Sequence, residues 1–291
     1  MKTDASGLVH HKKPLISPLR YPGGKSSLYP RLRSIVRENG LTSGTYVEPY
    51  AGGAGAAMGL LVTGQVDSVV INDFDPAIYA FWKLVVQAPD ELSRMIGSAE
   101  LSVSEWIRQK EIYLTAERDN YIDLGFAVFY LNRTNRSGVL NGGPIGGMNQ
   151  SGNYKIDARF NKEALIERIR LIALHASRVT VLNMDGIDVI DRYSKDREVL
   201  IYADPPYFEK AGSLYLNSFA DAHHSALASC LNSVKKARWL LTYDNVPRVA
   251  ELYSKRRREV FSLNYSAHRV VKATEVMVYS DSLLVSDSKA S

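Results

Sequence analysis

Residues 45–62 read TYVEPYAGGAGAAMGLLV, and this stretch indicates how the chain folds. Its first six residues predict a buried strand, because they lead with apolar and β-branched side chains. Small residues at 51–55 predict a tight turn, and the apolar residues after them predict a helix. SVVIND at 68–73 predicts a second strand, and PAIYAFWKLVV at 76–86 predicts a helix that begins on a proline. Strands that alternate with helices in this way predict a mostly parallel sheet.

The same alternation returns in the last part of the chain. Further strands are predicted at residues 178–183, 199–204, 238–244, 258–266 and 274–280. No helix is predicted between the last two, so we expect them to form an antiparallel hairpin at one edge of the sheet. The predicted fold class is therefore α/β, with a mostly parallel, Rossmann-like sheet and an antiparallel edge hairpin.

The centre of the chain has a different pattern. Residues 87–174 show helical periodicity in EWIRQKEIYL and LGFAVFYLNR and then pass through SGVLNGGPIGGMNQSGN, which is rich in glycine and asparagine. Loops of that length are often functional. We expect a helical insert at 87–174 within a domain formed by residues 1–86 and 175–291.

Composition and charge exclude several classes of protein. The chain has 291 residues of which 45% are hydrophobic, enough for a large core, and its single cysteine allows neither an internal disulfide nor a cysteine-cluster metal site. The net charge of +5 permits a polyanionic partner without requiring one. No apolar run approaches the ~18 residues that cross a bilayer. The first residues also lack the apolar stretch of a secretory signal, so we expect a cytoplasmic protein.

The glycine-rich turn after Glu48 and the acid at the end of the next strand indicate a ligand site. Such a turn lets the backbone approach a ligand at a helix N-terminus. Asp73 ends the next strand, where an acid can accept hydrogen bonds from ribose hydroxyls. The G-x-G-x-x-G spacing is absent, so a dinucleotide is not favoured. Tight packing explains the turn alone equally well, but the turn and the acid together favour an adenosine-containing ligand.

LIYADPPYFEKAG at 200–212 raises a second possibility. The proline pair must end the strand, which leaves Asp204 and Tyr207 at its tip on a stiff backbone. If the ligand is a methyl donor such as S-adenosylmethionine, the methyl acceptor could be an aromatic amine. The Asp204 carboxylate and the Pro205 carbonyl could then accept hydrogen bonds from its two N–H groups. Tyr207 could stack on the base, which would first have to flip out of a duplex. Taken alone, the motif is equally compatible with a rigid loop.

Motifs along most of the chain resemble one family. They are LRYPGGKSSLYPRL (19–32), YVEPYAGGAG (46–55), INDFDP (71–76), FYLNRTNRSG (129–138), RFNKEAL (159–165), ADPPY (203–207), WLLTYDN (239–245) and YSAHRVVKATEVMVYS (265–280). In this order they resemble the Dam-type (D12 class, alpha group) DNA adenine-N6 methyltransferases. The resemblance implies a class I S-adenosylmethionine-dependent methyltransferase fold in which the insert recognises the target.

The resemblance also implies an activity and its partners. The expected reaction is site-specific methyl transfer from S-adenosylmethionine to N6 of a flipped-out adenine in double-stranded DNA, without a metal. A bacterial or phage-encoded enzyme of restriction–modification, phage protection or epigenetic marking is compatible with it. The implied catalytic residues are Asp204, Pro205, Pro206 and Tyr207. The implied cofactor residues are Tyr21, Lys25, Glu48, Pro49, Tyr50, Gly52, Asp73 and Asp185. The implied DNA-binding residues are Arg133, Asn135, Arg136 and Tyr154.

The sequence departs from the family pattern at two places. Ala54 stands where the family often has glycine, and we expect this change to be harmless. The segment after Asn132-Arg133 lacks the aromatic-Asn-Gly-Leu-aromatic-Arg pattern, and Tyr154 is the nearest aromatic replacement. A GATC recognition sequence therefore cannot be carried over.

Alternatives remain open at this level. The chain could methylate adenine in RNA or cytosine N4 in DNA, or it could be a catalytically silent DNA-binding subunit of a defence complex.

Several residues also have ordinary structural explanations. Asp185 could simply cap the following helix. The remaining expectations are ordinary polar roles for His223 and His224, cap or turn roles for Asp221 and Asp244, and no assigned mechanism for Glu275.

Overall fold

The computed structural model describes residues 16–20, 25–117, 119–208, 220–266 and 270–286. Tyr21, which the family resemblance places beside the cofactor and the target base, lies outside these described residues. Within them, no helix combines the length and the apolar character that crossing a bilayer requires.

The centre of the fold is a sheet with strand order β3-β2-β1-β4-β5-β7-β6. Its strands are β1 (Thr45–Glu48), β2 (Ser68–Asn72), β3 (Val179–Leu182), β4 (Val199–Ala203), β5 (Arg238–Asp244), β6 (Arg257–Ser266) and β7 (Val270–Tyr279). Strands β1 to β5 run parallel to one another, and β7 runs antiparallel to both β5 and β6. This arrangement confirms the predicted mostly parallel sheet with an antiparallel edge hairpin.

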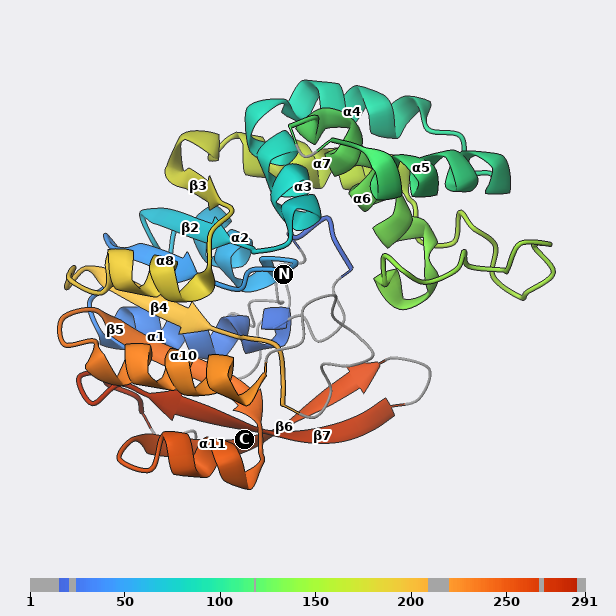
Figure 1. Cartoon of the computed structure of the whole chain (residues 1–291). Coiled ribbons are helices and arrows are strands. Elements are labelled where there is room, and N and C mark those ends of the chain that lie inside the picture. Colours follow the sequence, from blue (N-terminus) through green and yellow to red (C-terminus); the bar gives the residue numbers. More distant parts are fainter. Residues whose placement is uncertain (1–15, 21–24, 118, 209–219, 267–269, 287–291) are drawn as a thin grey trace, which may run out of the picture.

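Helices cover both faces of the sheet (Figure 1). They are η1 (Lys25–Leu28), α1 (Tyr29–Glu38), α2 (Gly55–Val62), α3 (Pro76–Gln87), η3 (Ala176–Arg178), α8 (Gly186–Tyr193), α10 (Asp221–Ser233) and α11 (Pro247–Leu252). Successive strand residues face opposite layers. Tyr46 packs in the hydrophobic cluster of α1, α2 and α3, whereas Val47 packs in the cluster of α8, α10 and α11. Both clusters sit directly under the strand ends that carry the predicted site.

The segment between α3 and β3 is helical, as its periodicity predicts. It contains α4 (Pro89–Ser98), α5 (Val103–Thr115), α6 (Tyr121–Thr134), η2 (Arg136–Gly138) and α7 (Lys162–Ala173). Three of these helices begin on a side-chain cap, in which Ser102, Asn120 and Asn161 accept backbone N–H bonds of α5, α6 and α7. Figure 1 shows these helices gathered at one end of the molecule, with the loop after α6 projecting from them.

The helical segment packs closely on α3. Phe129 of α6 stacks on Phe81 of α3 with ring centroids 6.1 Å apart, and Phe160 contacts Phe129 edge-on at 5.5 Å. A Cβ at Gly125 of α6 would lie 2.7 Å from the Ala80 carbonyl oxygen, so glycine is what lets the two helices approach. The residues of this segment belong to the same hydrophobic cluster as one face of the sheet. The division into two domains stays a prediction.

Candidate active site

Four acids gather at the carboxyl ends of neighbouring strands. Glu48 ends β1, Asp73 follows β2, Asp204 follows β4 and Asp244 ends β5. These strands are adjacent in the order β2-β1-β4-β5, so the acids share one edge of the sheet. Open α/β sheets bind their ligands at this edge.

The glycine-rich turn after β1 is held by the acid after β2. The backbone N–H of Gly52 donates to Asp73 Oδ2 at 2.9 Å, and its carbonyl accepts from Trp82 Nε1 at 2.8 Å. Gly52 has φ +47° and Ala54 has φ +42°, so both lie in the left-handed region. For alanine this conformation costs roughly 1–2 kcal/mol. Ala54 is therefore strained where glycine would not be, because this position strains any residue with a Cβ. The expectation that the replacement is harmless stays a prediction.

Two acids, Glu48 and Asp73, lie at this turn. The Glu48 side chain is buried and accepts a hydrogen bond from the Ala57 backbone N–H at 3.1 Å. Burial raises the pKa of Glu48 to about 8 and that of Asp73 to about 7. No lysine, arginine or histidine of the described chain forms an ion pair with either acid. A cationic ligand would favour their ionised forms, and S-adenosylmethionine, which carries a sulfonium and an ammonium group, fits that requirement.

Asn72 joins the elements around the turn. Its Nδ2 donates to the carbonyl of Pro49 at 2.8 Å and to that of Met184 at 3.0 Å, and its Oδ1 accepts from the Met184 backbone N–H at 2.9 Å. This side chain ties the ends of β1, β2 and β3 together. The sequence interpretation overlooked Asn72, although a polar residue inside the apolar run SVVIND is a usable signal.

Tyr50 and Asp185 lie on the other side of the turn. A Cβ at Gly186 would lie 2.4 Å from the Tyr50 ring, so the ring packs directly on the first residue of α8. Asp185 is exposed and caps α8 by accepting from the Ile187 N–H at 2.8 Å. The capping role is thus present in the structure. The cofactor roles of Tyr50 and Asp185 stay predictions.

The second half of the site surrounds Asp204. Its Oδ1 accepts a hydrogen bond from Thr242 Oγ1 at 2.7 Å and lies 3.4 Å from Lys25 Nζ. The Asp204 side chain keeps 22% of its surface exposed, which leaves it accessible to a ligand. Burial raises the pKa of Asp204 to about 6, while the positive charge of Lys25 lowers it. The carbonyl of Pro205 accepts no hydrogen bond from the described part of the chain, so two acceptors stand together where β4 ends.

Lys25 and Tyr207 meet a further acid, Glu275 of β7. Lys25 Nζ lies 3.1 Å from Glu275 Oε1 and donates to the Tyr207 hydroxyl. The Tyr207 hydroxyl also donates to the same Glu275 oxygen at 2.5 Å. All three side chains are buried. The structure therefore places Lys25, predicted near both cofactor and base, directly beside the catalytic motif. The sequence analysis named Glu275 without assigning it a mechanism, and a charge within the apolar strand TEVMVYS was the available signal for its contacts.

Phe208, the residue after Tyr207, is also held in place. Phe208 stacks on His224 with ring centroids 3.6 Å apart, and its backbone N–H donates to Asp244 Oδ1 at 3.2 Å. His224 Nδ1 and the Tyr243 hydroxyl form a hydrogen bond of 2.6 Å. His224 is 1% exposed, so it is a buried residue that packs against Phe208. Its interpretation as an ordinary residue, not a metal ligand or a general base, stays a prediction.

The predicted DNA-binding residues occupy different environments. Asn135 is completely buried, accepting from Trp106 Nε1 at 2.6 Å and donating to the Val139 carbonyl at 2.8 Å. Its side chain therefore orders the loop that follows α6. Arg136 is exposed, and the Tyr154 side chain is 67% exposed.

Arg133 belongs to a group of four arginines, the arginine cluster: Arg20, Arg133, Arg159 and Arg168. Burial and then the positive charges of Arg20, Arg168 and Arg159 lower the pKa of Arg133 to about 9. Their guanidinium groups bond to carbonyls, as in Arg20 to Asn135 and Arg168 to Ser17, both at 3.3 Å. None of the four forms an ion pair with a carboxylate of the described residues. Such a cluster favours an anionic ligand.

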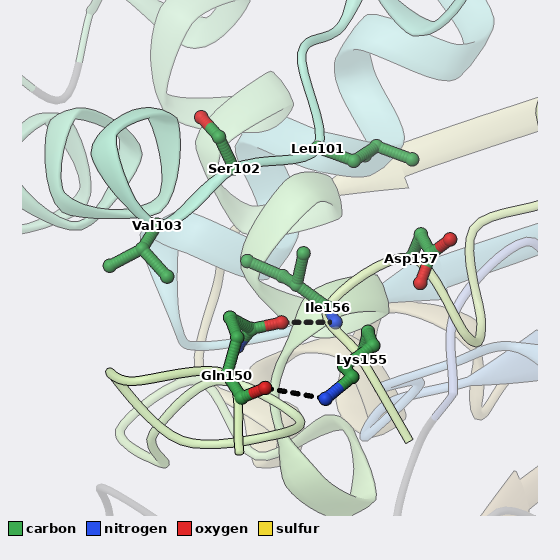
Figure 2. Close-up of a pocket in the computed structure, with 7 residues that line it drawn as sticks. All are labelled: Leu101, Ser102, Val103, Gln150, Lys155, Ile156 and Asp157. Carbon is green, nitrogen blue, oxygen red and sulfur yellow. Dashed lines mark hydrogen bonds between the residues drawn. The ribbon is translucent and has the colours of Figure 1, made fainter. Parts of the chain in front are cut away.

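A cavity of about 560 Å³ lies within the helical segment (Figure 2), and none of the proposed catalytic residues lines it. Its lining comes from the start of α5 and the loop after α6: Leu101, Ser102, Val103, Gln150, Lys155, Ile156 and Asp157. Gln150, at φ +47°, closes this loop on itself, since its Oε1 accepts from the Ile156 N–H at 2.8 Å and its carbonyl accepts from Lys155 Nζ at 2.5 Å. Figure 2 shows both bonds beside the cavity. The loop that presents Tyr154 is therefore an ordered element.

Comparison with solved structures gives distant resemblances. The rRNA methyltransferase aviRa from Streptomyces viridochromogenes is 13% identical, with a TM-score of 0.38 over 87% of this chain and 85% of that chain. A proposed RNA methyltransferase from Pyrococcus horikoshii is 12% identical, with a TM-score of 0.43 over 98% of this chain and 94% of that chain. No curated protein gives a significant sequence match.

The strand order, the glycine-rich turn and the acids at the strand ends define a class I S-adenosylmethionine-dependent methyltransferase. The model of the family "D12 class N6 adenine-specific DNA methyltransferase" matches residues 21–273. The chain belongs to this family and is an adenine-specific methyltransferase that uses S-adenosylmethionine.

Proposed function

We propose that this enzyme methylates N6 of a flipped-out adenine at specific sites in double-stranded DNA. The observation that carries the proposal is the pair of acceptors at the tip of β4. The Asp204 carboxylate is partly exposed, the adjacent Pro205 carbonyl accepts no bond from a described residue, and the ring of Tyr207 lies beside them. Two acceptors and an aromatic ring are what an adenine amino group and its base require.

The catalytic residues act by position and charge. The Asp204 carboxylate and the Pro205 carbonyl accept hydrogen bonds from the two N–H groups of the target amine. These hydrogen bonds favour a pyramidal nitrogen as positive charge develops on it. Pro206 stiffens this turn and Tyr207 stacks on the base. S-adenosylmethionine would be held by Glu48, Pro49, Tyr50, Gly52, Asp73 and Asp185 and would supply an electrophilic methyl group. The N–CH₃ bond would form as the S–CH₃ bond breaks, which turns the sulfonium into the thioether of S-adenosylhomocysteine, and the methylated amine would lose one proton to solvent. Asp204 must be ionised to act, and the hydrogen bond from Thr242 and the charge of Lys25 both favour that form.

The surroundings of the site suit a nucleic acid. The arginine cluster comes from the segment before η1 (Arg20), the end of α6 (Arg133), the loop after it (Arg159) and α7 (Arg168). The same loop carries the exposed Arg136 and Tyr154. Arginine binds phosphate well because its guanidinium forms paired hydrogen bonds. Flipping a base costs a few kcal/mol, of which stacking on Tyr207 returns ~1–3 kcal/mol. We infer that the helical insert contacts the DNA backbone and reads the target sequence.

The test is methyl transfer from radiolabelled S-adenosylmethionine to double-stranded DNA, single-stranded DNA and total RNA, followed by separation of the nucleosides. We expect label in N6-methyladenine from duplex DNA. The control is Asp204→Asn, which should lose transfer while still binding the cofactor. Label in RNA or in N4-methylcytosine would overturn the substrate, and cofactor binding without transfer to any of them would favour a silent subunit.

A further inference from the structure

We propose that Glu275 is a positioning residue for methyl transfer, which holds Lys25 away from Asp204 and fixes the ring of Tyr207. The inference rests on the proposed function, because it assigns the role of Asp204 as acceptor of the target amine. Glu275 itself does not touch the base in this scheme. It acts through two side chains that border the base position.

The backbone of Glu275 is rigid. It pairs in register with Asp244 of β5 on one side and with Phe261 of β6 on the other. Its side chain is 0% exposed. Burying a carboxylate at this depth is costly unless it is bonded, and here Oε1 contacts both Lys25 Nζ and the Tyr207 hydroxyl. Glu275 has no other role in the proposed mechanism, yet its side chain bonds to two residues of the site, Lys25 and Tyr207.

Two carboxylates compete for one ammonium group. Lys25 Nζ lies 3.1 Å from Glu275 Oε1 but 3.4 Å from Asp204 Oδ1. Glu275 draws the ammonium group toward β7, so that Asp204 benefits from the positive charge without closing into a tight ion pair. An Asp204 carboxylate in a tight pair with Lys25 would have fewer lone pairs to offer to the target amine.

The same oxygen orients the stacking ring. The Tyr207 hydroxyl donates to Glu275 at 2.5 Å, which fixes the end of the ring opposite the backbone. Lys25 Nζ lies 4.8 Å from the centroid of this ring. With the proline pair at one end and Glu275 at the other, the plane of the ring is set before a base arrives. Preorganisation of this kind raises the rate by reducing the ordering that the reaction must supply.

Removal of the negative charge should change both the rate and the pH dependence. In Glu275→Gln, Lys25 loses the Glu275 carboxylate and moves toward Asp204, the other described carboxylate with which it forms an ion pair. The pKa of Asp204 then falls, because a negative neighbour is lost and the positive one is closer. We expect a maximal rate about 10- to 100-fold lower, with the acidic limb of the pH–rate profile shifted to lower pH by about one unit. In Lys25→Met the limb should move to higher pH.

Other charged and titratable groups face Asp204 and must be separated from these effects. They are Lys25 on η1, Tyr46 and Glu48 on β1, Tyr202 on β4, Tyr243 on β5 and Glu275 on β7. The neutral hydroxyl of Thr242 also donates to Asp204. Burial raises the pKa of each of these three tyrosines well above its ordinary value, so they stay neutral in the assay range. Glu48, whose pKa is about 8, can titrate in that range. The profiles are therefore also recorded in a Glu48→Gln background.

The matched control is Glu259→Gln. Glu259 of β6 accepts from the Tyr279 hydroxyl at 2.7 Å and from Arg31 at 2.9 Å. It therefore forms the same kind of acid–tyrosine–cation group on the same hairpin, where Glu259 pairs with Met277, two register positions from the Phe261–Glu275 pair. This variant should keep both the maximal rate of the parent enzyme and the position of the acidic limb of its pH–rate profile. A Glu275→Gln enzyme that is slower with an unmoved limb would show a merely structural role and would overturn the proposal.

A second measurement needs neither cofactor nor DNA. In protein labelled with 3-fluorotyrosine, the ¹⁹F signal of Tyr207 is assigned by its loss in Tyr207→Phe and followed through a pH titration. We expect Glu275→Gln to displace this signal and to lower its titration midpoint, and Lys25→Met to raise the midpoint. The proposal would be overturned if the Tyr207 signal keeps its position in Glu275→Gln, or if its titration midpoints in Glu275→Gln and Lys25→Met do not differ. If the parent enzyme fails to methylate DNA, the proposed function fails while this measurement still tests the contacts of Glu275.

Discussion

At the scale of single residues, the charge of Asp204 depends on neighbours far away in the chain. Thr242 comes from β5, Lys25 from η1 and Glu275 from β7. Burial raises the pKa of the Asp204 carboxyl, and the Lys25 charge and the Thr242 bond lower it. The catalytic motif supplies the acid, whereas its protonation near neutral pH is set by residues outside the motif.

The bond from Thr242 can be tested by Thr242→Val, which keeps the shape and removes the hydroxyl. Since that hydroxyl favours the ionised form of Asp204, its loss should raise the pKa of the acid and move the acidic limb of the pH–rate profile up by about half a unit. Thr45→Val is the control, because Thr45 bonds Ser68 at 2.8 Å where β1 and β2 begin, at the opposite edge of the sheet. Equal profiles for the two variants would contradict the role of Thr242.

The strain at Ala54 gives a prediction about stability. Ala54→Gly removes the Cβ from a left-handed residue, whereas Ala56→Gly places glycine within α2. Both variants add the same backbone freedom to the unfolded chain. We expect Ala54→Gly to be more stable than Ala56→Gly by about 1–2 kcal/mol in denaturant unfolding. If Ala54→Gly is the less stable of the two, the turn does not carry the strain.

At the scale of elements, α6, α7 and the segment before η1 together build the arginine cluster. Asn132 holds these parts in place, since its Nδ2 donates to the Arg20 carbonyl at 2.8 Å and its Oδ1 accepts from the Arg20 N–H at 2.7 Å. The segment that carries Arg20 leads directly to Lys25. If the arginine cluster binds phosphate as we propose, a short stretch of sequence links it to the proposed catalytic residues.

Arg168→Gln tests whether the cluster meets DNA phosphates. The affinity for duplex DNA should fall, and the slope of log affinity against log salt concentration should decrease in magnitude by about one. Arg108→Gln is the control, because Arg108 of α5 is exposed and already paired with Glu105 at 2.7 Å. A slope that is unchanged in Arg168→Gln would remove the cluster from the interface.

At the scale of the whole molecule, the buried acids make stability depend on pH. The pKa values of Glu48, Asp73 and Asp204 are about 8, 7 and 6 in the folded chain, above the ordinary values of 4.5, 3.8 and 3.8. The folded state therefore holds protons that the unfolded chain has released. Their contribution to stability is complete below the ordinary values and is lost as the pH rises from about 4 to about 8.

This linkage predicts the behaviour of Glu48→Gln. Without ligand, the variant should gain unfolding free energy relative to the parent as the pH is raised from about 5 to about 8, because it has no buried carboxyl to ionise. S-adenosylmethionine should bind the parent more tightly at the higher pH, and this pH dependence should weaken in the variant. Unfolding and calorimetric titrations at both pH values measure the two effects. A difference in stability that does not change with pH would contradict the raised pKa of Glu48.

Local patterns were sufficient for the sheet and for the identity of the motifs. The periodicity of side chains, the proline pair and the glycine-rich turn act on nearest neighbours, so strands such as 199–204 could be predicted without a structure. The order of motifs was sufficient for the family, which the match over residues 21–273 confirms. The roles of individual residues at the cofactor and on DNA remain predictions.

The tertiary structure alone decided which of these residues meet and in what charge state. It brought Lys25 and Glu275 together from opposite ends of the chain, and it collected arginines from positions 20, 133, 159 and 168. It also placed Asn135 and His224 in the interior, where the sequence had indicated contact with DNA and an ordinary polar role. The physical reason is that burial and Coulomb interactions depend on distance in space, and a linear sequence does not contain that distance.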